Sequence, residues 1–166
     1  AGFGPDDEVQ SLEASLAGAK DASPGASGVV RVGMEPGADW NYSGGGYTLM
    51  QLVVEEVSGQ PFDAFMKERV FAPLGMTGST YTLEGTAPEM LAESFDTDGT
   101  AVPFRRFTSL AATSLFTTAA DMTLFLQAQI PSVAPDGATV LSQQNQALMR
   151  QPHAAKWGAD VWGLGV

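Results

Sequence analysis

The sequence contains no cysteine, a single histidine and few charged residues. Without cysteine there are no disulfides, thiolate nucleophiles or cysteine metal ligands, and the redox compartment is left open. Charged residues make up 16% of the chain, below the roughly 25% that is usual for soluble domains, so we expect part of the surface to be covered. The formal net charge is −11, from 19 acidic and 8 basic residues. This balance excludes a nucleic-acid partner, because no basic cluster can replace phosphate counterions.

Long apolar runs are also missing. None approaches the roughly 20 residues of a membrane-spanning helix, so we expect no membrane span. We also expect no signal peptide. The chain begins at Ala1 and ends in an apolar, glycine-rich stretch, so we expect two cut ends. With 166 residues, 44% of them apolar, the chain is long enough to form a core. We assign residues 1–166 to a single domain that is a fragment of a larger one.

Apolar spacing predicts a mostly helical fold with little β-structure, in the α+β class. Capping residues and glycine stops bound helices at about 5–18, 46–58, 61–73 and 118–130, and a last helix begins after Ser142. The helix that Thr118 caps is expected to bury an apolar face made of Met122, Phe125, Leu126 and Ile130. Residues 29–32 are β-prone and predict an edge strand or an extended connector, and residues 96–99 predict a hairpin turn.

The most informative stretch is the glycine-rich turn at residues 40–47, which runs directly into a helix. It places Tyr42 and Ser43 at a helix N-terminus, where free N–H groups and the helix dipole suit an oxyanion. Ser43 has no nearby base and no Gly-x-Ser-x-Gly elbow, so a helix cap is the favoured interpretation over a nucleophile. The glycine run lacks the Gly-Lys-Ser/Thr of a phosphate loop, so a tight turn is favoured there.

Several blocks, in order along the chain, resemble the penicillin-recognising serine hydrolases, and most closely the class C β-lactamase-related esterases and peptidases. The blocks are Trp40-x-Tyr42-Ser43-x-Gly45-x-Tyr47, Glu55-x-Val57-x-Gly59-x-x-Phe62, Pro73-Leu74-Gly75-Met76-x-x-Ser79-Thr80, Thr117-Thr118-Ala119-x-Asp121-Met122 and Trp162-Gly163-Leu164-Gly165. The resemblance extends from about Val30 to Gly165, which is nearly the whole chain.

This resemblance implies the helical domain of a two-domain serine hydrolase whose main antiparallel sheet is missing here. It implies hydrolysis through an acyl-serine, with Tyr42 as the catalytic proton carrier. Ser43, Gly44, Phe104 and Arg105 are the implied substrate-binding residues. The loop that contains Phe104 and Arg105 also includes Arg106 and Phe107, and either it borders the cleft or it is an exposed loop. Gly44 stands where the family has an asparagine, which favours an ester or small-amide substrate. We expect no metal and no cofactor, and the resemblance favours a periplasmic or extracellular location.

Two of the family's three motifs are absent from the sequence. No serine lies three residues before a lysine, so there is no Ser-x-x-Lys. Lys156-Trp157-Gly158 lacks the hydroxyl of Lys-Thr-Gly, and His153 does not begin a His-x-Gly. No lysine or arginine lies between Arg31 and Lys67 to favour a phenolate at Tyr42. The chain therefore resembles the central helical portion of such an enzyme, and we expect it to be inactive alone.

A second hypothesis is a non-catalytic binding or interaction domain built from the same helical unit. Low charge and apolar helix faces predict exposed apolar surface, which usually ends in an interface. We therefore expect self-association or a complementary chain through these faces. An upstream Ser-x-x-Lys and a downstream His-x-Gly in the same reading frame would decide for the enzyme.

Overall fold

The computed structural model describes residues 2–26, 28–86, 88–130, 140–152 and 163. Its contacts divide the chain into two compact units. The first is Ala1–Arg31, Ser43–Asp63 and Thr80–Phe116, and the second is Val32–Tyr42, Ala64–Ser79 and Thr117–Val166. Helices dominate the described residues and the only sheet among them has two strands, which confirms the predicted mostly helical α+β fold without a main sheet. The assignment of residues 1–166 to one fragmentary domain stays a prediction.

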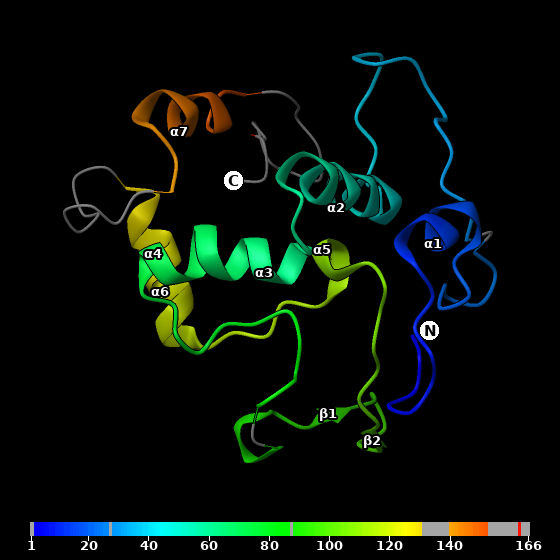
Figure 1. Ribbon diagram of the computed structural model, residues 1–166. Coiled ribbons are helices and arrows are strands. Elements are labelled where there is room, and N and C mark those ends of the chain that lie inside the picture. The colour runs from blue at the N-terminus through cyan, green and yellow to red at the C-terminus, as the bar shows by residue number, and fades with distance from the viewer. Residues whose placement is uncertain (1, 27, 87, 131–139, 153–162, 164–166) are drawn as a thin grey trace. The chain divides into compact units, whose positions relative to one another are not determined.

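In the first unit, α1 (Leu12–Gly18) and the short helix α5 (Leu110–Thr113) both contact α2 (Gly44–Ser58) (Figure 1). The helix predicted at 5–18 begins only at Leu12 in the structure. Ser11 caps α1 by accepting from the Ala14 N–H, whereas Asp7 accepts from the Gly4 N–H in a tight turn. The residues before Ser11 are held by long-range bonds instead, since Phe3 and Arg106 exchange two backbone hydrogen bonds of 2.8 and 2.9 Å.

The main helix of this unit has the predicted caps. Ser43 is the N-cap of α2, and its Oγ accepts from the Gly46 N–H at 2.9 Å, which confirms the cap interpretation. Gly59 ends the helix with φ 68°, a left-handed conformation that costs glycine little. The segment before α2 contains no regular strand in the structure. Val30 donates to the Leu16 carbonyl, so the residues around it form the extended connector rather than an edge strand.

The predicted hairpin turn is confirmed. Strands β1 (Ser94–Phe95) and β2 (Ala101–Val102) pair antiparallel, with Ser94 opposite Val102. Gly99 has φ 83°, and the Asp98 carboxylate accepts from the Thr100 N–H at 2.9 Å. Hydrogen bonds from Thr100 lower the pKa of Asp98. A 3₁₀ turn, η2 (Pro88–Met90), precedes the hairpin.

A nearly continuous helical run begins in the first unit and enters the second. It consists of α3 (Phe62–Met66), the π-helical turn η1 (Lys67–Phe71) and α4 (Ala72–Leu74). Gly75 ends the run with φ 72°. This span matches the predicted 61–73 helix.

The second unit also contains α6 (Ala119–Ala128) and α7 (Gln143–Met149). As predicted, Thr118 caps α6 and Ser142 caps α7, each by accepting a backbone N–H three residues on. The helix α6 contacts α4. The sequence predicted that this helix would end at about residue 130, before Pro131, which lies outside the described residues, and α6 already ends at Ala128.

The predicted buried face of α6 is partly wrong. Leu126 and Ile130 are 58% and 49% exposed, while the buried residues of the helix are Asp121 and Ala128. The physical reason is a polar contact. The Asp121 carboxylate accepts from the Gly78 N–H at 2.8 Å and from Ser79 Oγ at 2.7 Å, so that side of α6 turns inward.

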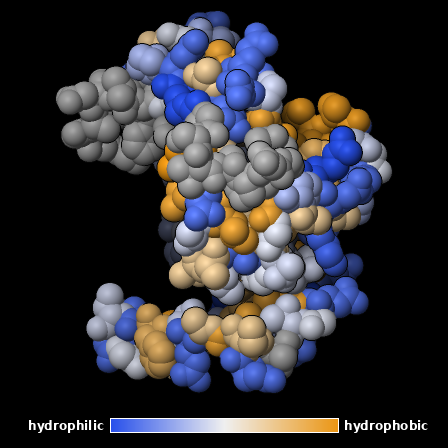
Figure 2. Space-filling model, turned by 90° about the vertical axis from the view of Figure 1, so that its left-hand side faces the viewer, coloured by the Kyte–Doolittle hydropathy of each residue, from blue (hydrophilic) through white to orange (hydrophobic). Residues whose placement is uncertain are grey.

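The helix α2 has an inverted arrangement of polar and apolar residues. Its buried residues are Thr48 and Gln51, whereas Met50, Val53 and Val57 are 59%, 54% and 83% exposed. Spacings of three and four residues place these three on one stripe of the helix. Hydrophobic atoms are visible at several points of the surface in Figure 2. Exposed apolar surface was the expectation from the sequence, and α2 provides its clearest example among the described residues.

Candidate substrate-binding site

The glycine run at the start of α2 permits a close approach between two segments. A Cβ on Gly45 would lie 2.7 Å from a methyl carbon of Val30. Real Cβ atoms essentially never come so close, so a side chain here would push the helix away from the connector. The neighbouring Gly46 N–H is already bonded to Ser43 Oγ. The sequence Ser43–Gly46 therefore forms a capped and tightly packed helix start.

Ser43 and Gly44 line a cavity of about 490 Å³ that lies within the first unit. Thr48 closes part of its wall. The Thr48 hydroxyl donates to the Gly44 carbonyl at 3.2 Å and lies 2.5 Å from the hydroxyl of Ser109, the residue that precedes α5. This pair of hydroxyls joins α2 to α5 next to two of the predicted substrate-binding residues.

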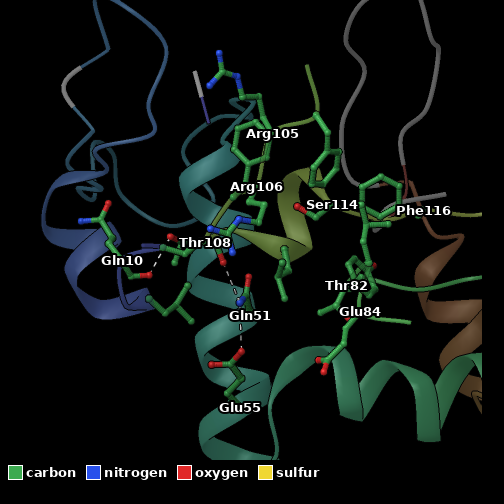
Figure 3. Close-up of a pocket in the computed structure, with 17 residues that line it drawn as sticks. Gln10, Gln51, Glu55, Thr82, Glu84, Arg105, Arg106, Thr108, Ser114 and Phe116 are labelled. Carbon is green, nitrogen blue, oxygen red and sulfur yellow. Dashed lines mark hydrogen bonds between the residues drawn. The ribbon is translucent and has the colours of Figure 1, made fainter. Parts of the chain in front are cut away.

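Phe104 and Arg105 line a different and larger pocket, with a volume of about 530 Å³ (Figure 3). Its walls are rich in aromatic rings. The ring centroids of Phe104 and Phe116 are 5.6 Å apart, and Tyr81 packs edge-on against Phe62 at 5.0 Å. Burial raises the pKa of the Tyr81 phenol, so this hydroxyl stays protonated at neutral pH.

The polar side of the larger pocket is organised by Gln51, which is only 3% exposed. Its Nε2 donates to the Glu55 carboxylate at 3.2 Å and to the Thr108 carbonyl at 3.4 Å, and its Oε1 accepts from the Ala111 N–H at 3.2 Å (Figure 3). Sequence reasoning missed Gln51. The available signal was a lone amide on the side of α2 opposite its apolar stripe.

Arg106, which the family resemblance placed on the loop beside the cleft, also lines this pocket. Its Nε donates to the Gly4 carbonyl at 3.4 Å, and its Nη2 donates to the Asp7 carbonyl. These bonds hold the guanidinium of Arg106, a half-buried residue that lines the pocket. The resemblance named Arg105 and Arg106 alike, and both line the pocket, but nothing local indicated that Arg106 would bond to Gly4 and Asp7.

Tyr42, the predicted catalytic residue, belongs to the second unit and is 67% exposed. The structure thus brings Ser43 and Gly44 together in one cavity and Phe104 and Arg105 together in another. Tyr42 is not among the described residues that line either of them. His153, Lys156 and Trp157 lie outside the described residues.

Within the described ranges, no group of three or more histidine, aspartate or glutamate side chains is placed to hold a metal ion. The helices of the same ranges are also too short or too polar for any of them to cross a bilayer.

The family model described as "Beta-lactamase" matches residues 5–166. The chain belongs to the β-lactamase family. This membership confirms the resemblance to the penicillin-recognising serine hydrolases and its coverage of nearly the whole chain.

The chain is also similar in sequence to named bacterial proteins. Penicillin-binding protein 4 of Amycolatopsis lactamdurans is 33% identical over 146 residues, which cover 75% of this chain and 36% of that protein. A putative D-alanyl-D-alanine carboxypeptidase of Escherichia coli K12 is 37% identical over 60 residues, covering 35% of this chain and 14% of that protein. The chain therefore spans about a third of the length of the first of these β-lactamase family members and less of the second.

Solved structures share the fold. The octameric penicillin-binding protein homologue of Pyrococcus abyssi matches with a TM-score of 0.70 at 22% identity, over 96% of this chain and 36% of that one. A penicillin-binding protein of Bacillus halodurans matches with a TM-score of 0.68 at 23% identity, over 95% of this chain and 46% of that one. Again, less than half of the larger protein is represented.

Proposed function

We propose that this chain is part of a β-lactamase-related serine hydrolase that cleaves an ester or amide through an acyl-serine intermediate. The family match over residues 5–166 supports this proposal. In it, Tyr42 carries the proton, and Ser43, Gly44, Phe104 and Arg105 border the substrate. The nucleophilic serine and its lysine come from sequence outside this chain, which spans about a third of its relative from Amycolatopsis. The same relatives favour a periplasmic or extracellular location.

The proposed reaction has two steps. The serine oxygen attacks the substrate carbonyl while Tyr42 takes the serine proton, and the bond to the leaving group breaks as that group receives the proton. Water then attacks the acyl-serine and releases the acid. A phenol with a pKa near 10 needs a neighbouring cation to act as a base near neutrality. Since no basic residue lies between Arg31 and Lys67, that cation is also supplied from outside this chain.

Labelling with a fluorescent penicillin tests the proposal. This chain alone is expected to remain unlabelled, whereas a longer protein that adds the flanking Ser-x-x-Lys segment should form a covalent acyl-serine. In that longer protein, Tyr42→Phe should slow acylation by roughly 10²–10⁴-fold, the range for loss of a general base. Tyr47→Phe is the matched control, because Tyr47 is another exposed tyrosine, in the first turn of α2. Equal acylation rates in both variants would remove Tyr42 from the mechanism.

The second candidate function is an interaction domain, and the exposed stripe on α2 favours it. Met50, Val53 and Val57 present an apolar surface with no charged residue between them on the stripe. Such surfaces mark interaction sites. We propose that this chain associates with itself or with a complementary chain through α2.

Sedimentation velocity tests the association. The chain is expected to show a concentration-dependent increase in sedimentation coefficient, which Val53→Lys with Val57→Lys should abolish by placing two charges on the stripe. Glu56→Lys is the control, because it adds a lysine to the same helix beside the stripe. A wild-type chain that stays monomeric at every concentration, or a control that dissociates equally, would contradict self-association through this stripe.

A further inference from the structure

The larger pocket of the first unit has the features of a ligand site that does not depend on hydrolysis. We propose that it binds a small aromatic monocarboxylate, with the carboxylate on Arg106 and the ring against the aromatic wall. This inference goes beyond the proposed function because it needs neither Tyr42 nor a nucleophile from outside the chain. All of its lining residues belong to one compact unit.

The charge on Arg106 is the first argument. The guanidinium is held by two neutral backbone carbonyls, those of Gly4 and Asp7, and not by a carboxylate. Among the described residues, Arg106 forms no ion pair with a carboxylate. Its Nη1 has no acceptor there either. A guanidinium whose orientation is already fixed loses little freedom when it binds an anion, and its planar donors suit a carboxylate.

The aromatic wall is the second argument. Phe104 and Phe116 form a tilted pair with an interplanar angle of 47°, and Tyr81 and Phe107 also line the pocket. Aromatic rings favour offset or edge contacts with another ring. The volume of about 530 Å³ lies in the range of small-molecule sites and leaves room for one ring with a short side chain.

Two glutamates at one end of the pocket determine whether a ligand with one or with two carboxylates binds better. In Figure 3, Glu55 and Glu84 lie at the end of the pocket opposite Arg106. The Glu55 carboxylate is held by Gln51 and by the Phe62 N–H at 3.2 Å. A second carboxylate on the far side of the ligand would meet these like charges, which disfavour it. The pocket therefore selects a monocarboxylate over a dicarboxylate.

Isothermal titration calorimetry on the wild-type chain tests this selectivity with three probes: 3-phenylpropionate, its neutral amide 3-phenylpropionamide, and the dianion 1,4-phenylenediacetate. Saturable binding of 3-phenylpropionate is expected, with the amide at least about tenfold weaker because it lacks the charge-assisted bond. The dianion should also bind more weakly than the monoanion. No saturation by 3-phenylpropionate, or equal affinity for the amide or the dianion, would overturn the proposal.

Two variants locate the site. Arg106→Gln should weaken 3-phenylpropionate about tenfold or more and leave the amide unchanged. Arg69→Gln is the control, since it removes the same charge from an exposed ion pair. If circular dichroism shows that Arg106→Gln does not fold, Glu84→Gln tests the binding mode instead. This variant should raise the affinity for the dianion several-fold. An equal loss with Arg69→Gln, or no gain with Glu84→Gln, would overturn the proposed binding mode.

Discussion

Replacing Asp121 with alanine is expected to destabilise the second unit by about 3–5 kcal/mol. This range is typical of substitutions that remove several buried hydrogen bonds to a charged group. Asp121 is 6% exposed, and its Oδ2 accepts from both the Gly78 N–H and Ser79 Oγ. Alanine would leave both donors without this acceptor. The bonds join the chain that follows α4 to the first turn of α6, so their loss separates two segments of the unit.

Urea unfolding followed by circular dichroism would measure this loss of stability, and amide hydrogen exchange at Gly78 would locate it. Asp121→Asn is the matched control, because its amide keeps one oxygen acceptor of similar shape and should cost clearly less. Glycine 78 should exchange much faster in the alanine variant than in the asparagine variant. Unchanged exchange at Gly78 would show that the carboxylate does not hold this junction.

Replacing Gln51 with leucine is expected to destabilise the first unit by about 2–4 kcal/mol, because a side chain of similar size would break three hydrogen bonds without removing their partners. The amide of Gln51 bonds to the Glu55 carboxylate, the Thr108 carbonyl and the Ala111 N–H. Leucine would leave the backbone groups of Thr108 and Ala111 unsatisfied next to the pocket.

The same change at Gln144 provides the control, since Gln144 is exposed on α7. Gln144→Leu is expected to alter the free energy of unfolding by less than about 0.5 kcal/mol. Urea midpoints of the two variants give the comparison, and hydrogen exchange at Ala111 reports the local effect. A Gln51→Leu variant as stable as the wild type would mean that apolar packing, not the amide, organises this side of α2.

Helix caps and glycine turns could be predicted from the sequence, because each depends on residues only a few positions away. Ser43, Thr118 and Ser142 cap helices as predicted, and Gly59 and Gly99 take the left-handed conformations expected of them. Each of these positions depends on a side chain or a backbone angle within a few residues. Local rules therefore sufficed for the helix limits of α2 and for the hairpin turn.

Long-range contacts decided the features that sequence reasoning missed. The helix α1 begins later than predicted because Phe3 pairs with Arg106, about a hundred positions along the chain. The inward face of α6 followed Asp121 rather than the apolar periodicity. In the candidate site, the sequence pointed to the loop that contains Phe104 and Arg106 but not to Gln51, whose role appears only when distant segments meet. The catalytic role of Tyr42 stays a prediction.

The helix α2 buries polar residues and exposes apolar ones, so its two sides are under different evolutionary constraints. Thr48 and Gln51 hold the helix to its own unit, so substitutions there are felt within this chain. Met50 and Val57 contribute little to that unit, and selection on them reflects whatever molecule or segment they meet. Among natural variants, we expect the first pair to change together with Ser109 and Thr108, and the second pair to change independently of them.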